Sequence, residues 1–235
     1  MSQMKYSAKI VLYNNYFDMN DNLSAKSILG FFQGVASKHA QFIGVDYQTM
    51  LAKNLYWVLS RVKFDIVKKP QVDQIVIVET WPHQKGKIDF DRDFLIKSEN
   101  GEVLVKGTSK WCVIDTTTRM LQKSDNVSYL GECSTDVVYP DRFGKIMVPD
   151  MEPQKLFEHI VRYSDLDHNK HMNNTNYADL VLSATCCQDF SHFEINFISE
   201  CLLGDKIEVF SLCENNQTYV IGKAQDKTVF CSVVY

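Results

Sequence analysis

The chain has 235 residues, of which 45% are hydrophobic and 12% aromatic, so it can bury a substantial core as one large domain or as two domains of about 120 residues. Its net charge of −4 argues against nucleic-acid binding, and the absence of any apolar run of about 18 residues argues against a membrane protein. The sequence also starts without the apolar segment of a secretory signal, so we expect a cytoplasmic protein with reduced cysteines.

The first unit is predicted to contain one strand, then a polar turn and a helix. The turn has the sequence YFDMNDNLS, from Tyr16 to Ser24, and the apolar residues after it recur at roughly helical spacing as far as Ile43. The hydroxyl of Ser24 can cap the helix by accepting a hydrogen bond from its first turn. We therefore predict a helix of roughly four to five turns after Ser24.

Four runs rich in β-branched and aromatic residues follow this helix, separated by sequences typical of turns. They read LYWVLSRVKFDIV, VDQIVIVETW, KIDFDRDFLIKS and EVLVKGTSKWCVID. This pattern predicts four successive antiparallel strands.

The segment from about residue 124 to residue 152 holds two of the five prolines and shows no sustained periodicity, so we predict a linker that crosses the surface of the first unit. The earlier order then repeats, with the strand FEHIVRY, a polar turn, a helix from about Asn174 to Cys187, and the strands HFEINFIS, KIEVFSL, TYVIGKA and TVFCSVVY. We predict domains over residues 1–130 and 153–235, joined by a linker over residues 131–152.

The two polar turns indicate a duplicated module. Aligned at a separation of 147 positions, they pair Tyr16 with Tyr163, Asp18 with Asp165, Asn20 with Asp167, Asn22 with Asn169, and Ser24 with His171. Only the late copy then combines an acid with an imidazole, which predicts one working site on a duplicated α+β scaffold. Each unit has one long helix for five strands, and a curved antiparallel sheet can wrap such a helix. Periodicity alone does not distinguish this layout from other α+β folds.

The late turn, YSDLDHNKHMNN, directly precedes an apolar helix and concentrates carboxylates, amides and imidazoles. Its D-x-D-x-N pattern resembles the start of a calcium loop, but Lys170 stands where that loop needs glycine and Asn176 where it needs glutamate. His168 and His171 could join Asp167 around zinc or iron, yet their spacing lacks a separate third ligand. We therefore expect no metal site.

Helix capping is a competing explanation for this turn, because aspartate and asparagine commonly cap helices and form turns. Capping accounts for Asn173 and Asn174 better than chemistry does. It does not explain why an imidazole, at His171, accompanies Asp167 and Asn169. These last three residues are therefore our candidates for a functional set.

Asp167, Asn169 and His171 within DLDHNKHMNNTNY, together with Glu200 and Cys201 in FISECLLGD, resemble the active-site signature of the acyl-acyl carrier protein (acyl-ACP) thioesterases. In the first half, YWVLSRVKF, VETWP, the RDF tripeptide and SKWCVID resemble segments of the same family. The resemblance spans nearly the whole chain. It implies two tandem hotdog domains, of which the late one is catalytic and the early one shapes the acyl pocket, with no metal or organic cofactor.

The reaction that this resemblance implies is hydrolysis of fatty acyl-ACP to a free fatty acid and holo-ACP. It requires an activated water and a donor for the oxygen that becomes negative, which unpaired N–H groups at a helix N-terminus can supply. We expect Glu200 to be the base, His171 to orient it or share its proton, Asn169 to contact substrate or water, and Asp167 to fix Asn169 and His171. A covalent acyl intermediate on a carboxylate is the alternative.

Cys201 is the alternative nucleophile, since a thiolate beside an imidazole is a familiar hydrolytic pair. Strand alternation places Cys201 on the face of Phe193, Ile195 and Phe197, and Glu200 on the opposite face. A bulge or a strand end between Phe197 and Glu200 would bring the glutamate into the site. We prefer Glu200 as the reactive group and regard Cys201 as a small buried side chain.

The expected partner is acidic acyl carrier protein, and the charge distribution agrees, because residues 1–145 carry a net charge of +3 and residues 146–235 a net charge of −7. Candidate docking cations are Lys85, Lys87 and Arg92, or Lys68 and Lys69, although ordinary solvated side chains are the simpler explanation for any one patch. Alternative functions are an acyl-coenzyme A thioesterase and a non-catalytic acyl-binding protein. Chain length and oligomeric state, including a homodimer, stay open.

Three tryptophans, at positions 57, 81 and 111, lie in the predicted strands of the first half. Each can shape the acyl cavity, and each can equally be a core residue.

Overall fold

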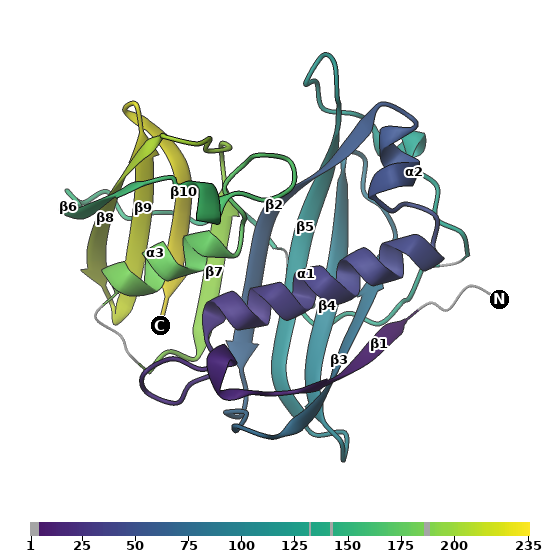
Figure 1. The fold of residues 1–235 in the computed structure, drawn as a ribbon, viewed down its shortest axis with the longest axis horizontal. Coiled ribbons are helices and arrows are strands. Elements are labelled where there is room, and N and C mark those ends of the chain that lie inside the picture. The colour runs from purple at the N-terminus through teal and green to yellow at the C-terminus, as the bar shows by residue number, and fades with distance from the viewer. Residues whose placement is uncertain (1–4, 132, 142, 186–188) are drawn as a thin grey trace.

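In the computed structural model, which describes residues 5–131, 133–141, 143–185 and 189–235, ten antiparallel strands form one curved sheet (Figure 1). The strands are β1 Tyr6–Val11, β2 Leu55–Ile66, β3 Ile75–Pro82, β4 Asp89–Ser98, β5 Val103–Asp115, β6 Gln154–Ile160, β7 His192–Phe197, β8 Lys206–Glu214, β9 Gln217–Ala224 and β10 Lys227–Val234. The helices are α1 Ala25–Phe42, α2 Tyr47–Leu51 and α3 Asn176–Ala184, with 3-10 turns η1 Asn14–Tyr16, η2 Ser124–Asn126 and η3 Tyr163–Asp165.

The sheet consists of two equivalent halves. Its strand order is β1-β3-β4-β5-β2-β7-β10-β9-β8-β6. Read from the outer edge to the junction, the early half is β1-β3-β4-β5-β2 and the late half is β6-β8-β9-β10-β7, so equivalent strands occupy equivalent places. The halves join where β2 pairs with β7, from Arg61 opposite Asn196 to Asp65 opposite His192. This pairing removes two exposed strand edges. The repeated strand, turn, helix and four-strand order predicted from the sequence is confirmed.

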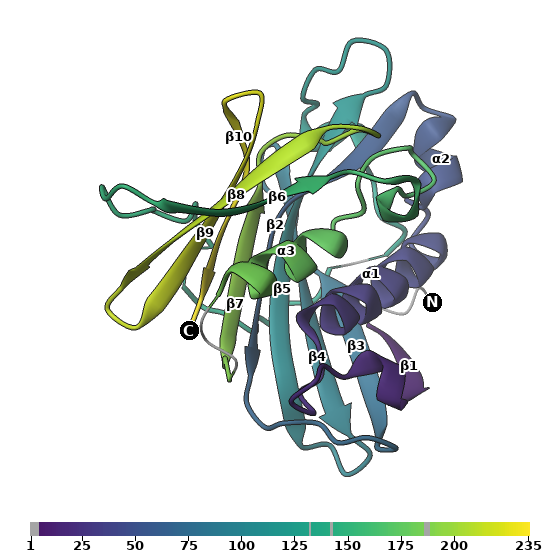
Figure 2. The same cartoon turned by 60° about the vertical axis from the view of Figure 1, so that its left-hand side comes forward.

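Both long helices lie on the same side of the sheet, α1 over the early half and α3 over the late half (Figures 1 and 2). Helix α1 begins after Ser24, whose side chain accepts a hydrogen bond of 3.1 Å from the backbone N–H of Ser27. Phe32 on α1 stacks on Phe94 of β4, with ring centroids 4.3 Å apart. None of the helices in the described part of the chain is both long and apolar enough to cross a bilayer.

Two details of the helices differ from the sequence-based expectation. Helix α3 ends at Ala184 because Thr185 has extended backbone angles, and the predicted end at Cys187 lies outside the described residues. The short helix α2 was not predicted, because five residues are too few to show helical periodicity. It begins after Asp46, whose carboxylate accepts the backbone N–H groups of Gln48 and Thr49.

The segment after η2 crosses the face of the sheet opposite the helices, as predicted for a linker. Its backbone accepts a hydrogen bond from Trp81 Nε1 at Asp136 and donates one to the Asp93 carboxylate from Val138. Farther along, the N–H of Ile146 donates to the side-chain oxygen of Asn196 in the late half. The linker therefore contacts both halves, and the domain boundaries at residues 130 and 153 stay a prediction.

The two polar turns are equivalent at a separation of 149 positions, so the alignment at 147 was wrong. In the early turn, the Asp18 carboxylate accepts the N–H groups of Asn20 and Asn22. In the late turn, Asp167 accepts the N–H groups of Asn169 and His171. Each turn also contains one residue with a left-handed backbone, Asp21 in the early copy and Lys170 in the late copy. Polar residues recur at every second position in both turns, so the two turns can be aligned almost equally well at separations that differ by two residues.

Candidate active site

The late turn is held in one conformation by Asp167. Its Oδ1 accepts the backbone N–H of Asn169 at 2.8 Å and that of His171 at 3.2 Å, and its own N–H donates to the carbonyl of His171 at 2.8 Å. Lys170 reverses the chain with a φ of +67°. The carboxylate of Asp167 therefore fixes the backbone at Asn169 and His171.

Glu200 reaches this turn because β7 ends at Phe197. The segment after the strand runs beside the turn, where Met172 donates its N–H to the carbonyl of Cys201 at 2.8 Å and His171 forms a bridge with Leu202. Glu200 Oε1 lies 3.4 Å from Nδ1 of His171. The strand end that the sequence required between Phe197 and Glu200 is present, and it directs the glutamate into the site.

Cys201 points away from the site. Its side chain is fully buried and lies beside the hydroxyl of Tyr177 in α3. Burial raises the pKa of the Cys201 thiol, so at neutral pH it stays protonated. Among the described residues that line the cavity, Glu200 is present and Cys201 is not.

Arg119 is a site residue that the sequence did not reveal. It lies in the hairpin after β5, in a left-handed conformation, and its Nη2 donates to Oε2 of Glu200, the oxygen not facing His171. The hairpin is shaped by Asp115, whose carboxylate accepts N–H groups from Thr117 and Thr118. The sequence TTTRM reads as an ordinary surface turn, and no local signal links it to a glutamate 81 residues away.

Tyr56 in β2 is a second site residue contributed by the early half. Burial raises its pKa to about 12, and the negative charges of Glu200 and Asp167 add to the effect. Its phenol therefore stays protonated at neutral pH and can act only as a neutral donor or acceptor. Two side chains of the early half, Arg119 and Tyr56, thus lie near Glu200 of the late half.

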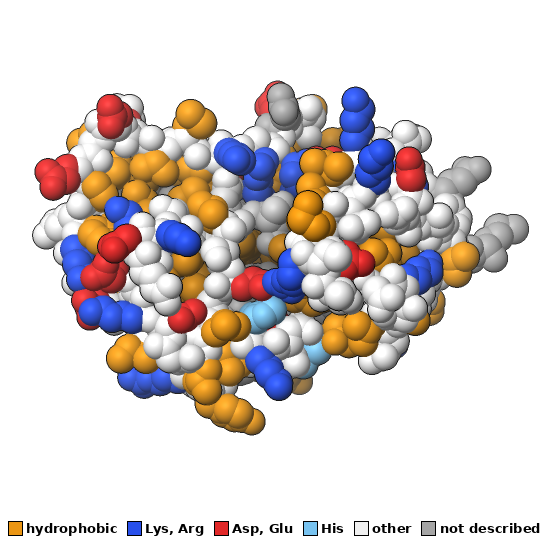
Figure 3. Space-filling model, turned by 90° about the horizontal axis from the view of Figure 1, so that it is seen from above, with side chains coloured by type: hydrophobic (Ala, Val, Ile, Leu, Met, Phe, Trp, Pro, Cys, Tyr) orange, Lys and Arg blue, Asp and Glu red, His pale blue; other side chains and the backbone are white. Residues whose placement is uncertain are grey.

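A cavity of about 650 Å³ extends from the late turn into the early half. Its lining includes the four predicted site residues and mostly apolar side chains from α1, β2, β4 and β5: Asp167, Asn169, His171, Glu200, Leu29, Phe32, Ala36, Val62, Phe90 and Phe94. Trp57 and Trp111 also line it, whereas Trp81 is core, with its Nε1 bound to the carbonyl of Asp136. On the molecular face seen in Figure 3, imidazoles gather with acidic and basic side chains around a central hollow.

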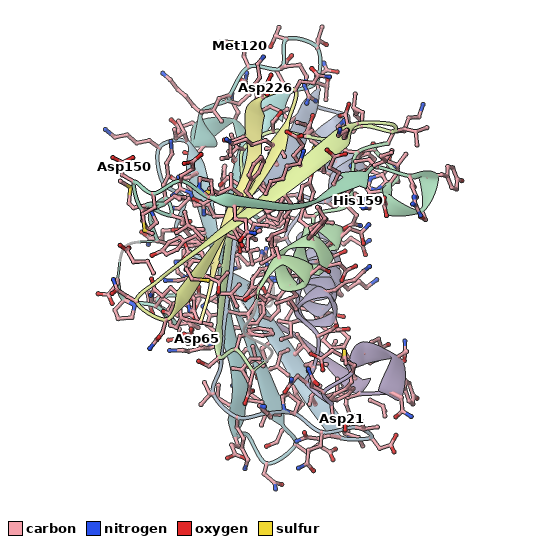
Figure 4. The ribbon with its side chains drawn as sticks, turned by 90° about the vertical axis from the view of Figure 1, so that its left-hand side faces the viewer. Asp21, Asp65, Met120, Asp150, His159 and Asp226 are labelled. Atoms are coloured by element: carbon pink, nitrogen blue, oxygen red, sulfur yellow. The ribbon has the colours of Figure 1, made fainter. Side chains whose placement is uncertain are left out.

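The early turn is chemically different from the late one. At the separation of 149 positions, Asn22 occupies the place of His171. The segments that follow β2 and β7 also have matching backbone hydrogen bonds. After β2, the N–H groups of Val67 and Lys68 donate to the carbonyl of Leu104, and after β7, those of Ile198 and Ser199 donate to the carbonyl of Val229. The next residue in each segment is Lys69 in the early half and Glu200 in the late half, so Lys69 occupies the place of Glu200. The early turn, marked by Asp21 in Figure 4, lies at the opposite end of the molecule from the hairpin that carries Met120. It lacks the imidazole and the glutamate, which supports a degenerate early site.

The expected surface role of Arg92 is wrong. Its side chain is only 8% exposed and lines the cavity, so it cannot belong to a docking patch with Lys85 and Lys87. It is buried because alternate residues of β4 face α1. In the other proposed patch, Lys68 forms an ion pair with Glu102.

No three His, Cys, Asp or Glu side chains form a metal-ligand cluster in the described part of the chain. His168, which the turn offered as a ligand, packs edge-on against the ring of Tyr47 with centroids 4.8 Å apart.

Comparison with protein families assigns this chain to one class. The acyl-ACP thioesterase N-terminal domain matches residues 3–127, and the acyl-ACP thioesterase C-terminal domain matches residues 150–229. The chain therefore belongs to the acyl-ACP thioesterase family, as its motifs indicated.

Two plant proteins are among its relatives. The chain is 32% identical over 198 residues to oleoyl-acyl carrier protein thioesterase 1, chloroplastic, of Arabidopsis thaliana, an alignment that covers 77% of this chain and 55% of that protein. It is 28% identical over 231 residues to oleoyl-acyl carrier protein thioesterase 2 of the same plant, covering 89% and 63%. The matched region thus spans only 55–63% of the length of these two relatives.

Solved structures share the fold along the whole chain. An acyl-ACP thioesterase from Bacteroides thetaiotaomicron superposes with a TM-score of 0.86 at 23% identity, covering 98% of this chain and 97% of that one. A 12:0-ACP thioesterase from Umbellularia californica superposes with a TM-score of 0.83 at 19% identity, covering 100% and 97%. The predicted α+β fold of two tandem hotdog domains is confirmed.

Proposed function

We propose that the chain is an acyl-ACP thioesterase that hydrolyses fatty acyl-ACP to a free fatty acid and holo-ACP. The observation that carries this proposal is the position of Glu200, whose carboxylate faces His171 and Arg119 at one end of a mostly apolar cavity. Such a cavity can take up an acyl chain while the polar end holds its thioester. Membership of the family and the activities named for its relatives support the same reaction.

In this reaction Glu200 acts as the general base. It accepts a proton from a water molecule, the water oxygen bonds to the acyl carbon, and the carbon–sulfur bond breaks. The proton then passes to the departing thiolate of the carrier. His171, with Nδ1 3.4 Å from the carboxylate, orients Glu200 or shares its proton, while Arg119 holds the second oxygen.

The turn before α3 supplies the donor for the oxygen that becomes negative. The backbone N–H of Asn174 donates to no described residue, and Asn174 lines the cavity. N–H groups at the start of a helix are preorganised for negative charge, which is the requirement for an oxyanion site. Asn169 contacts substrate or water from the same turn. All these groups come from one chain, so the chemistry does not require a homodimer.

The proposed substrate is tested by comparing carriers. Purified protein is given the same acyl group on acyl carrier protein and on coenzyme A, over a panel of increasing chain lengths, and the released thiol is measured. We expect faster hydrolysis with acyl carrier protein. A preference for coenzyme A would instead identify an acyl-coenzyme A thioesterase, and intact thioester at stoichiometric protein for every chain length would identify an acyl-binding protein.

The proposed base is tested by a pair of substitutions. Glu200→Gln keeps the shape of the side chain but cannot accept a proton, so we expect kcat to fall by about 10²- to 10⁴-fold. Cys201→Ser alters a buried thiol outside the cavity and should leave most of the activity. Both variants are compared by steady-state kinetics after circular dichroism shows that they fold. The reverse ranking would transfer the reactive role to Cys201.

A further inference from the structure

Arg92 is a buried cation in the wall of the acyl cavity. It lies in β4 between Phe90 and Phe94, and all three side chains line the cavity beneath α1. In the sheet, β4 is separated by β5 and β2 from β7, the strand that leads to Glu200 (Figure 1). The guanidinium therefore belongs to the part of the cavity remote from the late turn.

The contacts of this guanidinium supply no negative charge. Nη1 lies 3.1 Å from Nδ1 of His39 on α1 and 3.1 Å from Oγ1 of Thr80 on β3. Neither an imidazole nor a threonine hydroxyl is an anion at neutral pH. No carboxylate in the described part of the chain forms an ion pair with Arg92.

The two aspartates beside Arg92 in the sequence are engaged elsewhere. Asp91 Oδ1 lies 2.6 Å from Nζ of Lys110. Asp93 Oδ2 lies 2.8 Å from Nε2 of His83, on the face of the sheet that the linker crosses. Because neighbouring residues of a strand point to opposite faces, Asp93 cannot turn toward the cavity to neutralise Arg92.

Arg92 nevertheless keeps its charge. Burial lowers its pKa to about 10, which still leaves the side chain protonated at neutral pH. A buried charge without a counter-ion is costly, and a guanidinium has five N–H donors to satisfy. An acyl chain that ends in a methyl group has no hydrogen-bond acceptor for these N–H groups. An acyl chain that carries an oxygen at its far end has one.

Other polar groups accompany Arg92 in the cavity wall. Ser109 on β5 and Tyr129 both line the cavity, among aromatic side chains. The hydroxyl of Ser109 accepts a hydrogen bond of 2.8 Å from Trp111 Nε1. Burial raises the pKa of Tyr129, which therefore remains a neutral phenol. The cavity wall around Arg92 is thus partly polar, which an entirely apolar chain would not require.

We propose that the inner end of the cavity is a binding subsite for an oxygen-bearing end of the acyl chain, with the Arg92 guanidinium as its donor. A terminal carboxylate binds most strongly because it neutralises the buried charge, and a terminal hydroxyl binds less strongly. The subsite rests on the proposed function, because Arg92 binds the far end of an acyl chain whose thioester lies at Glu200. It makes the chain selective for acyl groups with two polar ends.

Ligand binding without turnover tests this subsite. The probes are the primary amide of a fatty acid (the monoacid probe) and the monoamide of an α,ω-dicarboxylic acid (the diacid probe) of equal carbon number, so that only the diacid probe carries a carboxylate. Both are titrated into the wild-type protein by calorimetry over a series of chain lengths. At the length that spans the cavity, we expect the diacid to bind about 10- to 100-fold more tightly, as for a hydrogen bond to a charged group. Equal affinity of monoacid and diacid at every length would overturn the proposal.

Three variants assign the effect to Arg92. Arg92→Met keeps much of the volume without the charge and should abolish the preference for the diacid, whereas Arg92→Lys should keep part of it. Arg119→Met removes the cation near the late turn and should leave the preference intact. A preference that survives Arg92→Met, or that disappears in Arg119→Met, would overturn the subsite.

The folding of the variants and their hydrolysis of acyl-ACP are measured in separate experiments. Thermal melts identify the variants that fold, and apolar replacement of a buried charge is commonly tolerated. If Arg92→Met does not fold, the wild-type comparison of monoacid and diacid decides alone. Hydrolysis of matched acyl-ACP thioesters, with and without a terminal carboxylate, is then measured. Loss of hydrolysis for both, with the diacid preference retained, would contradict the thioesterase proposal and leave the binding subsite standing.

Discussion

The carboxylate of Glu200 is held by one group from each half of the chain. His171 of the late turn faces one oxygen, and Arg119 of the early hairpin binds the other. In the proposed reaction Glu200 is the base, and a carboxylate held at both oxygens keeps one orientation toward the attacking water. Small displacements of reacting groups are costly in rate. The early half therefore contributes a side chain to the candidate site as well as much of the cavity wall.

We predict that Arg119→Met lowers kcat by about 10²-fold with little change in KM, because Glu200 loses the contact that orients it. Arg119→Lys should restore part of the rate. Stability should change little, since the Arg119 side chain is 51% exposed and exposed ion pairs contribute at most about 1 kcal/mol. Steady-state kinetics and thermal melts measure both effects.

A double-mutant cycle separates this positioning role from a role in binding the carrier. If Arg119 acts through Glu200, its replacement should cost almost nothing in a Glu200→Gln background. Additive losses in kcat, or an increase in KM alone, would contradict the positioning role.

Between elements, the junction of β2 with β7 contains a partly buried ionic cluster. Asp65 Oδ1 lies 2.5 Å from Nδ1 of His192, and the Asp65 carboxylate also accepts a hydrogen bond of 2.9 Å from Tyr139 in the linker. Burial opposes the charge on Asp65, but hydrogen bonds from His192 and Tyr139 outweigh it and lower the pKa of Asp65 to about 2. Burial likewise opposes the charge on His192, and Asp65 and Glu194 outweigh it and raise the pKa of His192.

These shifts predict that the junction is most stable between about pH 4 and pH 6.5. The pKa of Asp65 is lower in the folded protein, so its contribution is present above about pH 4 and is lost as the pH falls toward 2. The pKa of His192 is higher in the folded protein, so its contribution is full below about pH 6.5 and is lost as the pH rises through the folded value.

Urea unfolding over this pH range measures the effect. The free energy of unfolding should decline on both sides of the window. His192→Gln should flatten the decline above about pH 6.5. An unchanged profile in that variant would show that the cluster does not govern the stability of the junction.

The contact between α1 and β5 depends on the absence of a side chain at Gly107. A Cβ there would lie 2.3 Å from the ring of Phe32 and 3.1 Å from the backbone oxygen of Lys63. We predict that Gly107→Ala destabilises the protein by about 1–3 kcal/mol through overpacking. Gly30→Ala, in α1 with no atom within 4 Å of its added Cβ, is the matched control and should stabilise by about 0.5–1 kcal/mol. Chemical denaturation compares the two, and similar effects would contradict this packing.

At the scale of the whole molecule, the repeat of elements could be predicted because each strand and helix carries its own periodicity. The pairing of β2 with β7 could not, since it joins segments far apart in the sequence. The family resemblance singled out Glu200 together with the late turn, whereas nothing in the sequence linked Arg119 to Glu200 across 81 residues. Arg92 was misplaced because its charge suggested the surface, whereas strand alternation directs it into the cavity.

The proposed active site draws residues from both halves, so we predict that neither half hydrolyses acyl-ACP alone. A late half by itself exposes the β7 edge and lacks Arg119 and most of the cavity wall. The chain can be divided at Asp150, which is exposed, lies at the margin of the molecule in Figure 4 and precedes β6. The two pieces, residues 1–150 and 151–235, are then expressed separately and together.

Co-expression should restore hydrolysis, because the β2–β7 pairing and the shared core can re-form between the pieces. Co-purification through a tag on one piece, followed by steady-state assay with acyl-ACP, measures both association and activity. The intact chain carrying Glu200→Gln is the control for background hydrolysis. Full activity in the late piece alone would show that Arg119 and the early cavity wall are dispensable, and would contradict a site assembled from the two halves.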